Sequence, residues 1–94
     1  MYTLTRTSDG TRKQGEISIA VTVTEDGWFS EEHARPRVGV QLLVGEMVTR
    51  PGPEASARIT SRITRIVSEQ SCEVIFETES GSIYRWVYVR PTRH

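Results

Sequence analysis

Three stretches in the C-terminal third of the chain are rich in branched and aromatic residues, and short polar breaks separate them. β-Branched and aromatic side chains fit a pleated sheet better than a helix, and the breaks Glu69–Cys72 and Ser80–Ser82 have the composition of turns. The pattern predicts a meander of three antiparallel strands against which the rest of the chain folds. The predicted strands are Arg62–Ser68, Glu73–Glu79 and Ile83–Val89.

Cross-strand pairing suggests a register for this meander if its loops are Gln70–Cys72 and Ser80–Ser82. Directly opposed aromatic, aliphatic or oppositely charged pairs contribute roughly 0.2–1 kcal/mol each. We therefore predict the register that maximises them, with a bulge near Thr64–Arg65. The predicted pairs are Ile66–Phe76, Phe76–Trp86 and Thr64–Thr78, with Glu77 between Arg65 and Arg85 on the other face.

The predicted meander is apolar on both faces, so it needs cover on both faces. An apolar face of several hundred Å² is rarely left to water, and two-fold dimers are the commonest remedy. We therefore predict a homodimer joined partly through a sheet face or edge, unless the sheet closes into a barrel. The two apolar sets are Ile66, Val74, Phe76 and Trp86 on one face, and Val67, Ile75, Ile83 and Val87 on the other.

The N-terminal part of the chain predicts two more strands. Tyr2–Arg6 has the composition of a short strand, and Ser8–Gly15 is a polar loop that ends in glycine. Glu16–Glu25 alternates strictly, which is typical of a half-buried strand, and we expect it to pair with Tyr2–Arg6 as a hairpin. Its branched residues share one face: Ile17, Ile19, Val21 and Val23.

The middle of the chain is less regular. Asp26-Gly27 predicts a turn, and Ser30–Ala34 predicts one helical turn with Ser30 as its N-cap and acids in its first turn. Val38–Val48 predicts one or two short strands bent at Gly45. The proline-containing Thr49–Glu54 is expected to be a flexible loop, and the polar tail Pro91–His94 is expected to fray.

The segment Ala55–Val67 leaves two interpretations open. Ala55, Ile59 and Ile63 have helical spacing, and Pro53 can begin a helix. The many β-branched residues favour a strand instead.

Length and composition set the outer limits of the fold. The 94 residues suffice for one domain, 1–94, and a mixture of 36% hydrophobic and 26% charged residues is typical of a folded domain rather than a disordered chain. Together with the strand pattern, this predicts an all-β fold, as a small antiparallel β-barrel or sandwich with at most one short helical turn.

Charge and cysteine content narrow the function classes. Twelve acidic and twelve basic residues give zero formal charge, which disfavours non-specific coating of nucleic acid. A single cysteine permits no disulfide within the chain, as expected in a reducing compartment. The first ten residues lack a signal pattern and no apolar run has membrane length. We expect a cytoplasmic, bacterial protein that does not enter the membrane.

The segments ITSRITRI (59–66) and VIFETESGSIYRW (74–86) resemble short all-β proteins of unknown function that are carried on bacterial mobile elements such as phages, plasmids and gene cassettes. The resemblance covers the C-terminal third of the chain and brings no catalytic residues. It implies a small antiparallel barrel with an unassigned role.

Two groups of residues are candidates for binding. The aromatic residues of one strand can stack bases or sugars, or else form the core. Nearby arginines can bind phosphate or an acidic partner, or else pair with Glu69, Glu73 and Glu79. The candidate binding residues are Arg58, Arg62, Arg65, Tyr84, Trp86 and Tyr88.

Catalytic and metal chemistry find little support in the sequence. Cys72 and His33 are the residue types of a thiol–imidazole pair, but nothing in the sequence brings them together. Two histidines and one cysteine do not supply the ligands of a metal centre, and no phosphate-binding glycine loop is present. We expect no cofactor and no catalytic residue. The predicted function is a non-catalytic binding module, with a nucleic-acid-binding barrel as the alternative and an enzyme third.

Overall fold

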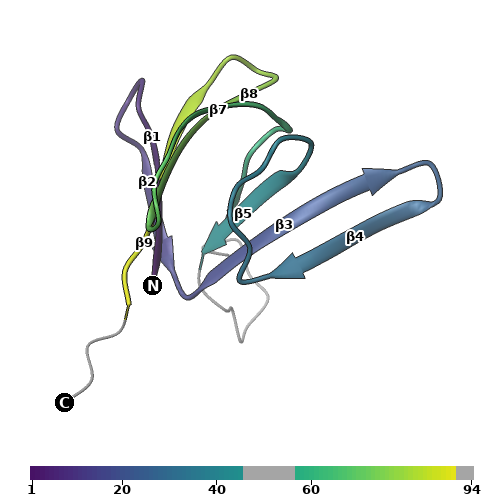
Figure 1. Ribbon diagram of the computed structural model, residues 1–94, viewed down its shortest axis with the longest axis horizontal. Coiled ribbons are helices and arrows are strands. Elements are labelled where there is room, and N and C mark those ends of the chain that lie inside the picture. The colour runs from purple at the N-terminus through teal and green to yellow at the C-terminus, as the bar shows by residue number, and fades with distance from the viewer. Residues whose placement is uncertain (46–56, 91–94) are drawn as a thin grey trace.

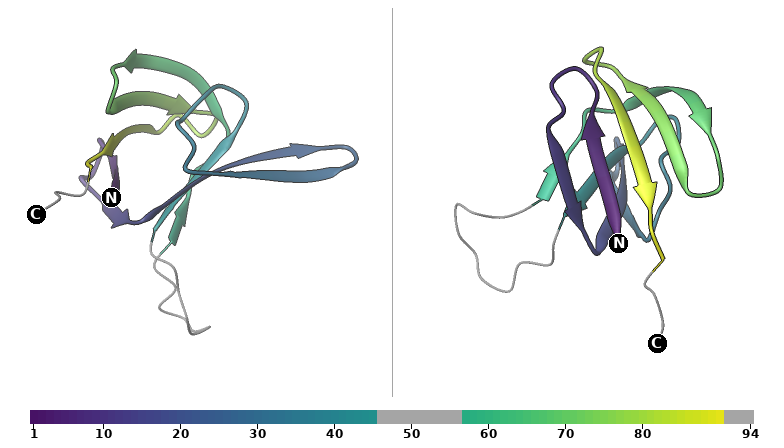
Figure 2. Two further views of the ribbon diagram at one scale, coloured as in Figure 1. Left: turned by 60° about the horizontal axis from the view of Figure 1, so that its bottom comes forward. Right: turned by 90° about the vertical axis from the view of Figure 1, so that its left-hand side faces the viewer.

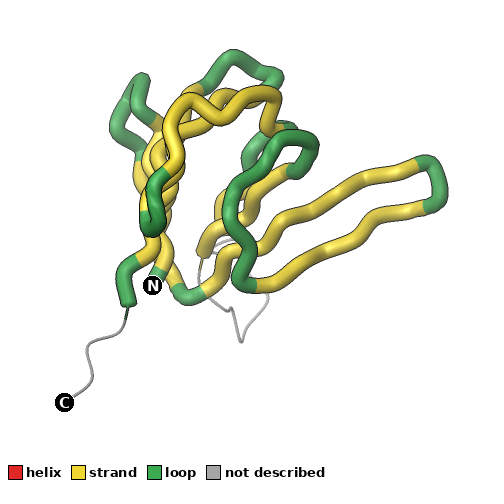
Figure 3. Tube along the Cα trace, viewed as in Figure 1, coloured by secondary structure: helices red, strands yellow, loops and turns green. Residues whose placement is uncertain are grey.

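The computed structural model describes residues 1–45 and 57–90. These residues form nine strands and no helix (Figure 3), which confirms the all-β prediction. The strands make two antiparallel sheets that pack as a sandwich rather than closing into a barrel (Figure 1). Since the described residues form strands and connections only, they include no helix of the length and hydropathy that a membrane span requires.

The first sheet has five strands in the order β2-β1-β9-β8-β7, and it contains the predicted C-terminal meander as its last three strands. Each neighbouring pair is antiparallel, and the N-terminal strand β1 adds to the meander at β9. The strands are β1 Tyr2–Arg6, β2 Arg12–Gly15, β7 Ile63–Glu69, β8 Glu73–Thr78 and β9 Ile83–Tyr88.

The partner of β1 differs from the predicted one. We expected Tyr2–Arg6 to pair with Glu16–Glu25, but β1 pairs with β2, which lies inside the predicted polar loop. Asp9 closes this shorter hairpin, because its carboxylate accepts hydrogen bonds from the Arg6 guanidinium at 2.6 Å and the Thr11 N–H at 2.9 Å. These bonds hold the pKa of the Asp9 carboxyl well below its usual value.

The second sheet has four strands in the order β4-β3-β5-β6. Strand β3 confirms the period-two pattern, and β5 falls within the predicted Val38–Val48 segment. Residues 46–48 of that segment, the predicted loop Thr49–Glu54 and the predicted tail Pro91–His94 lie outside the described residues. The strands are β3 Ile17–Thr24, β4 Gly27–Glu32, β5 Gln41–Gly45 and β6 Ala57–Ile59.

The predicted helical turn at Ser30–Ala34 is wrong, because β4 continues as a strand to Glu32. Its backbone pairs with β3 over six residues, from Gly27 opposite Thr24 to Glu32 opposite Ile19. A ladder of this length satisfies more backbone groups than one isolated helical turn. The strand ends where His33 takes a positive φ of 55°.

The strand interpretation of Ala55–Val67 holds for its described residues, 57–67, but they form two strands in different sheets. Strand β6 ends at Ile59 in the second sheet, and β7 begins at Ile63 in the first. The chain crosses between the sheets at Thr60, whose buried hydroxyl accepts the Leu42 N–H at 3.1 Å and donates to the Ser61 carbonyl at 2.7 Å. These bonds fix the crossing.

The register of the meander is partly as predicted. Strands β7 and β8 show the predicted pairs Ile66–Phe76 and Arg65–Glu77, and the predicted bulge begins after Ile63, which takes the place of Thr64 opposite Thr78. Strands β8 and β9 are shifted by two residues, so Trp86 lies opposite Val74 and not opposite Phe76. For the same reason the predicted pairing of Glu77 with Arg85 is wrong, and Arg85 lies opposite Ile75.

The shift comes from the turn between β8 and β9. The Thr78 N–H donates to the Ser82 carbonyl at 3.0 Å, so the loop comprises residues 79–81, and Gly81 supplies the positive φ of 85° that it needs. Because the shift is even, each residue keeps its predicted face.

The core lies between the two sheets, around Trp86. Its ring is 2% exposed, and its N–H donates to the buried Ser18 hydroxyl on β3 at 3.1 Å. Ser18 in turn donates to the Ala34 carbonyl at 2.9 Å. One serine therefore joins both sheets and the β4–β5 connection. The buried apolar side chains around this centre include Tyr2, Leu4, Ala20, Leu42, Val44, Ile63, Val74, Phe76 and Tyr84.

Arg35, in the β4–β5 connection, contacts the Trp86 ring and the β7–β8 turn. Its guanidinium lies 5.6 Å from the centroid of the Trp86 ring, a cation–π distance. It donates to the carbonyls of Gln70, at 2.6 Å, and of Ser71, and it reaches the Glu69 carboxylate at 3.2 Å. The arginine thus fastens the β7–β8 turn to the β4–β5 connection.

Candidate interaction surface

The aromatic residues proposed for stacking lie on β9, and most of their surface faces inward. Tyr84 is 5% exposed and Trp86 is 2% exposed. Tyr88 is half-buried, with its ring centroid 5.0 Å from that of Tyr2. The rings of Tyr84 and Trp86 therefore belong to the core, and they offer no face to a base or sugar in solvent.

The structure divides the proposed arginine stripe between two sheets. Arg58 lies on β6 of the four-stranded sheet, where its backbone pairs with Val44. Arg62 precedes β7 and contacts Glu79 at 3.2 Å, and Arg65 on β7 contacts Glu77 at 3.3 Å. The two arginines with described side chains therefore have carboxylate partners within the chain.

Cys72 and His33 lie in different connections. Cys72 is exposed in the turn between β7 and β8. His33 follows β4, and its Nδ1 atom lies 3.2 Å from the Tyr2 hydroxyl in a hydrogen bond. In the part of the chain that the structure describes, histidine, cysteine and carboxylate side chains form no group of three that could hold a metal ion.

One surface that the sequence did not single out is the outer side of the four-stranded sheet. On β3 the small residues Ser18 and Ala20 face the core, so the branched residues of the same strand face outward. Pairing with β4, β5 and β6 places further apolar side chains on that side. We call this the outer apolar face, and it comprises Ile17, Ile19, Val21, Val23, Trp28, Leu43 and Ile59.

The outer apolar face is almost free of charge, and it is exposed at Val23, Trp28 and Ile59 while its other residues are half-buried. Val23 is 67% exposed, Trp28 68% and Ile59 51%. In the described residues of these four strands, Glu32 is the single ionisable side chain at an outward position. Large apolar patches of this kind on a folded chain mark interaction surfaces.

The face continues along a hairpin that projects from the body. Strands β3 and β4 extend past the sandwich as a two-stranded arm (Figure 1 and the left view of Figure 2). Every residue of β4 is exposed. Trp28 lies opposite Val23 on the outer side, while Phe29 lies opposite Thr22 on the inner side and is 64% exposed. The projecting part thus carries an exposed aromatic side chain on each side.

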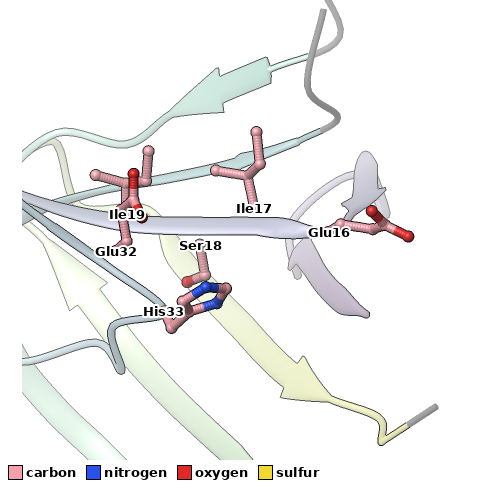
Figure 4. Close-up of a pocket in the computed structure, with 6 residues that line it drawn as sticks. All are labelled: Glu16, Ile17, Ser18, Ile19, Glu32 and His33. Carbon is pink, nitrogen blue, oxygen red and sulfur yellow. The ribbon is translucent and has the colours of Figure 1, made fainter.

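A pocket of about 250 Å³ lies at the base of this hairpin. Ile17 and Ile19 point to one side of β3, and Ser18 points to the other side, toward His33 (Figure 4). The Glu32 side chain lies beside Ile19, its cross-strand neighbour. The pocket therefore combines an apolar wall with carboxylate and imidazole groups at its rim, and it adjoins the outer apolar face. Its lining residues are Glu16, Ile17, Ser18, Ile19, Glu32 and His33.

The sequence carried a signal for this surface. The alternation in Glu16–Glu25 separates a branched face from a face of small residues, but it does not say which one turns inward. The inward side is marked by Trp86, whose N–H donates to the Ser18 hydroxyl, and by Ala20, which is buried in the same core. Neither feature is visible in the pattern of β3 itself.

Comparisons of the chain with protein-family models, with curated proteins and with solved structures found no match to any of them.

Proposed function

We propose that this chain is a non-catalytic protein-interaction module, and that the outer apolar face is its binding surface. The observation that carries the proposal is the exposure of Val23 and Trp28 on a sheet face with a single charge, Glu32. Val23 and Trp28 add little to the stability of a monomer, because both side chains lie outside its core. Contact with another apolar surface removes them from water, at roughly 25 cal/mol per Å² buried.

The extent of the face supports the proposal. Strands β3, β4, β5 and β6 have eight, six, five and three residues. At about 3.3 Å per residue and a strand spacing of about 4.8 Å, they cover about 350 Å² together, which is within the roughly 300–600 Å² of surface patches that are often functional. Two such faces in contact bury about 700 Å², the size of a weak or transient interface.

The nucleic-acid alternative has weaker support than a protein partner. Arg62 and Arg65 contact carboxylates of the same chain, and the tip of the projecting hairpin carries Glu25 and Asp26. Negative charge there repels phosphate. We place the module in the cytoplasm, because its single cysteine suits a reducing compartment.

Binding of an apolar dye tests the proposal on purified protein. At submicromolar chain concentration, the fluorescence of bis-ANS should rise on addition of the wild-type chain. The double variant Val23→Lys/Trp28→Ser should reduce that rise by more than half, because it places a charge and a hydroxyl on the outer apolar face. Val67→Lys is the matched control, since Val67 is 45% exposed on the five-stranded sheet.

A wild-type chain that gives no more dye fluorescence than the double variant would refute the proposal. Equal losses in the double variant and in Val67→Lys would also refute it, because the dye would then report no particular face. Unfolding midpoints of all three proteins confirm that each is folded. All three positions are already exposed, so their substitution is expected to leave the midpoints unchanged within error.

A further inference from the structure

We infer that the partner of the outer apolar face is a second copy of this chain, and that Trp28 of each copy enters the pocket at the hairpin base of the other copy. The inference rests on the proposed function and adds the identity and geometry of the partner. It combines two observations on one hairpin: the projecting side chain of Trp28, and a pocket at the hairpin base that residues from both sides of β3 line.

The composition of the face favours a second copy over a different partner. A two-fold interface brings each patch against itself, so it tolerates few charges of one sign. The outward positions of the four strands carry one ionisable residue, Glu32, in the described part of the chain. Interfaces between identical subunits are also the more apolar class. The face therefore offers almost no charged group by which a different, charged partner could be recognised.

The spacing of the two features allows a reciprocal contact. Trp28 lies opposite Val23, and the pocket includes Ile19 on the same side of β3. Four residues separate Val23 from Ile19, which is about 13 Å along a strand. If a two-fold axis runs across the strands near Val21, the hairpin tip of each copy lies over the hairpin base of the other. Both Trp28 side chains then reach the pocket of the opposite copy.

The pocket suits an indole ring in size and chemistry. A cavity of about 150 Å³ holds benzene, and this pocket has about 250 Å³. Ile17 and Ile19 offer an apolar wall, and the Glu32 carboxylate can accept the indole N–H. Trp28 is 68% exposed in the single chain, so its burial on association supplies much of the apolar area.

This interface differs from the one expected from the C-terminal meander. On the outer side of the five-stranded sheet, Arg85 contacts Glu73 at 2.6 Å and Arg65 contacts Glu77 at 3.3 Å. These ion pairs lie among the half-buried Ile75, Ile83 and Val87. The more exposed apolar surface lies on the four-stranded sheet instead.

Paired variants test the reciprocal contact. Trp28→Ser removes the projecting side chain and keeps the pocket. Glu32→Arg keeps Trp28, fills the pocket with a longer side chain and removes the acceptor. Both residues are exposed in the single chain, so both variants should fold. Sedimentation equilibrium of the wild type at micromolar concentration should give a dimer mass, and each variant should weaken dimerisation at least tenfold.

Mixing the two variants gives the decisive measurement. In a mixed dimer, Trp28 of the Glu32→Arg chain meets the unaltered pocket of the Trp28→Ser chain, so one of the two contacts is restored. The mixed dimer should therefore form at least threefold more tightly than either variant dimer, because one of two equal contacts accounts for the square root of the tenfold loss. Energy transfer between dyes reports it, because the single cysteine, Cys72, is exposed on the other sheet and can be labelled.

Controls separate this geometry from other modes of association. Phe29→Ser changes the opposite side of the same hairpin, and Val67→Lys changes the other sheet; both should leave the dimer within twofold of the wild type. A dimer that is insensitive to Trp28→Ser, or that shows no recovery on mixing, overturns the reciprocal contact. A wild-type chain that stays monomeric overturns the second copy as partner, while a positive bis-ANS result would still support the binding surface itself.

Discussion

The outer faces of the two sheets are built differently. On the five-stranded sheet, long charged side chains lie among the apolar ones and form the ion pairs Arg85–Glu73 and Arg65–Glu77. On the four-stranded sheet, branched residues stand side by side with Glu32 as the single outward charge of the described strands. The stems of charged side chains cover apolar surface while their heads stay in water. The first face is thus suited to solvent, and the second is suited to a partner.

The two tryptophans show the same contrast at single residues. Trp86 is 2% exposed, bonded to Ser18 and covered by the Arg35 guanidinium. Trp28 is 68% exposed on the projecting hairpin. The same residue type therefore serves the stability of the chain in one place and is available for association in the other.

Replacing each tryptophan by alanine should give the largest difference between the two regions. Trp86→Ala leaves a cavity and removes the N–H that the Ser18 hydroxyl accepts, so the free energy of unfolding should fall by roughly 3–5 kcal/mol. Trp28→Ala should change it by less than about 0.5 kcal/mol, as is usual for an exposed side chain. Chemical denaturation of monomeric protein measures both. Losses of similar size would mean that the projecting hairpin packs against the body.

A smaller loss of stability is expected when Ser18, which joins the two sheets, is replaced. Ser18→Ala leaves the buried Trp86 N–H without an acceptor, and an unsatisfied buried group costs about 1–3 kcal/mol. Ser30→Ala is the matched control, because Ser30 is exposed on the neighbouring strand β4. Denaturation of the two variants under identical conditions compares them. A loss of stability confined to Ser30→Ala would contradict the assignment of inner and outer sides.

The fold could be predicted from the sequence as far as local patterns determine it. Strand composition identified β1, β3 and the meander, since period-two alternation and β-branched residues act within each segment. The turn at Ser80–Ser82 was predicted one residue too late, because Gly81 sits at the end of the loop and not in its centre. Ser30 resembled a helix cap, and its pairing with Val21 on β3 overrode that local preference.

The outer apolar face could not be predicted from the sequence of any single segment, because it depends on contacts between distant segments. The branched face of β3 turns outward because the N–H of Trp86, almost seventy residues later, needs the Ser18 hydroxyl on the opposite side. Arg35 was not singled out, because its partners are backbone carbonyls of a distant turn. The aromatic strand β9 was correctly identified as important, while its role in the core depended on which strands cover it.

The ion pairs on the five-stranded sheet should contribute less to the free energy of unfolding than Trp86 or Ser18. Glu73→Gln removes the carboxylate charge that Arg85 contacts at 2.6 Å, and partly exposed pairs of this kind contribute about 0.2–1 kcal/mol. The loss should shrink in 1 M salt, where charges are screened over about 3 Å. Denaturation at low and high salt measures the difference. A loss that does not depend on salt would show that packing, and not charge, is responsible.

The smallest expected effect is a loss of local stability in acid, and it concerns the β1–β2 hairpin of the five-stranded sheet. The β1–β2 hairpin is closed by Asp9, whose pKa is lowered by hydrogen bonds from Arg6 and from the Thr11 N–H. Because the folded chain holds this carboxyl charged, its contribution is complete above the ordinary aspartate pKa of about 3.9 and is lost as the pH falls through the lower folded value. Hydrogen exchange at pH 5 and pH 2.5, corrected for intrinsic rates, should show the β1–β2 hairpin opening more readily at the lower pH. In Asp9→Asn the opening should already be raised at pH 5 and should change less with pH. An Asp9→Asn chain that follows the wild type across this range would show that the charge does not close the hairpin.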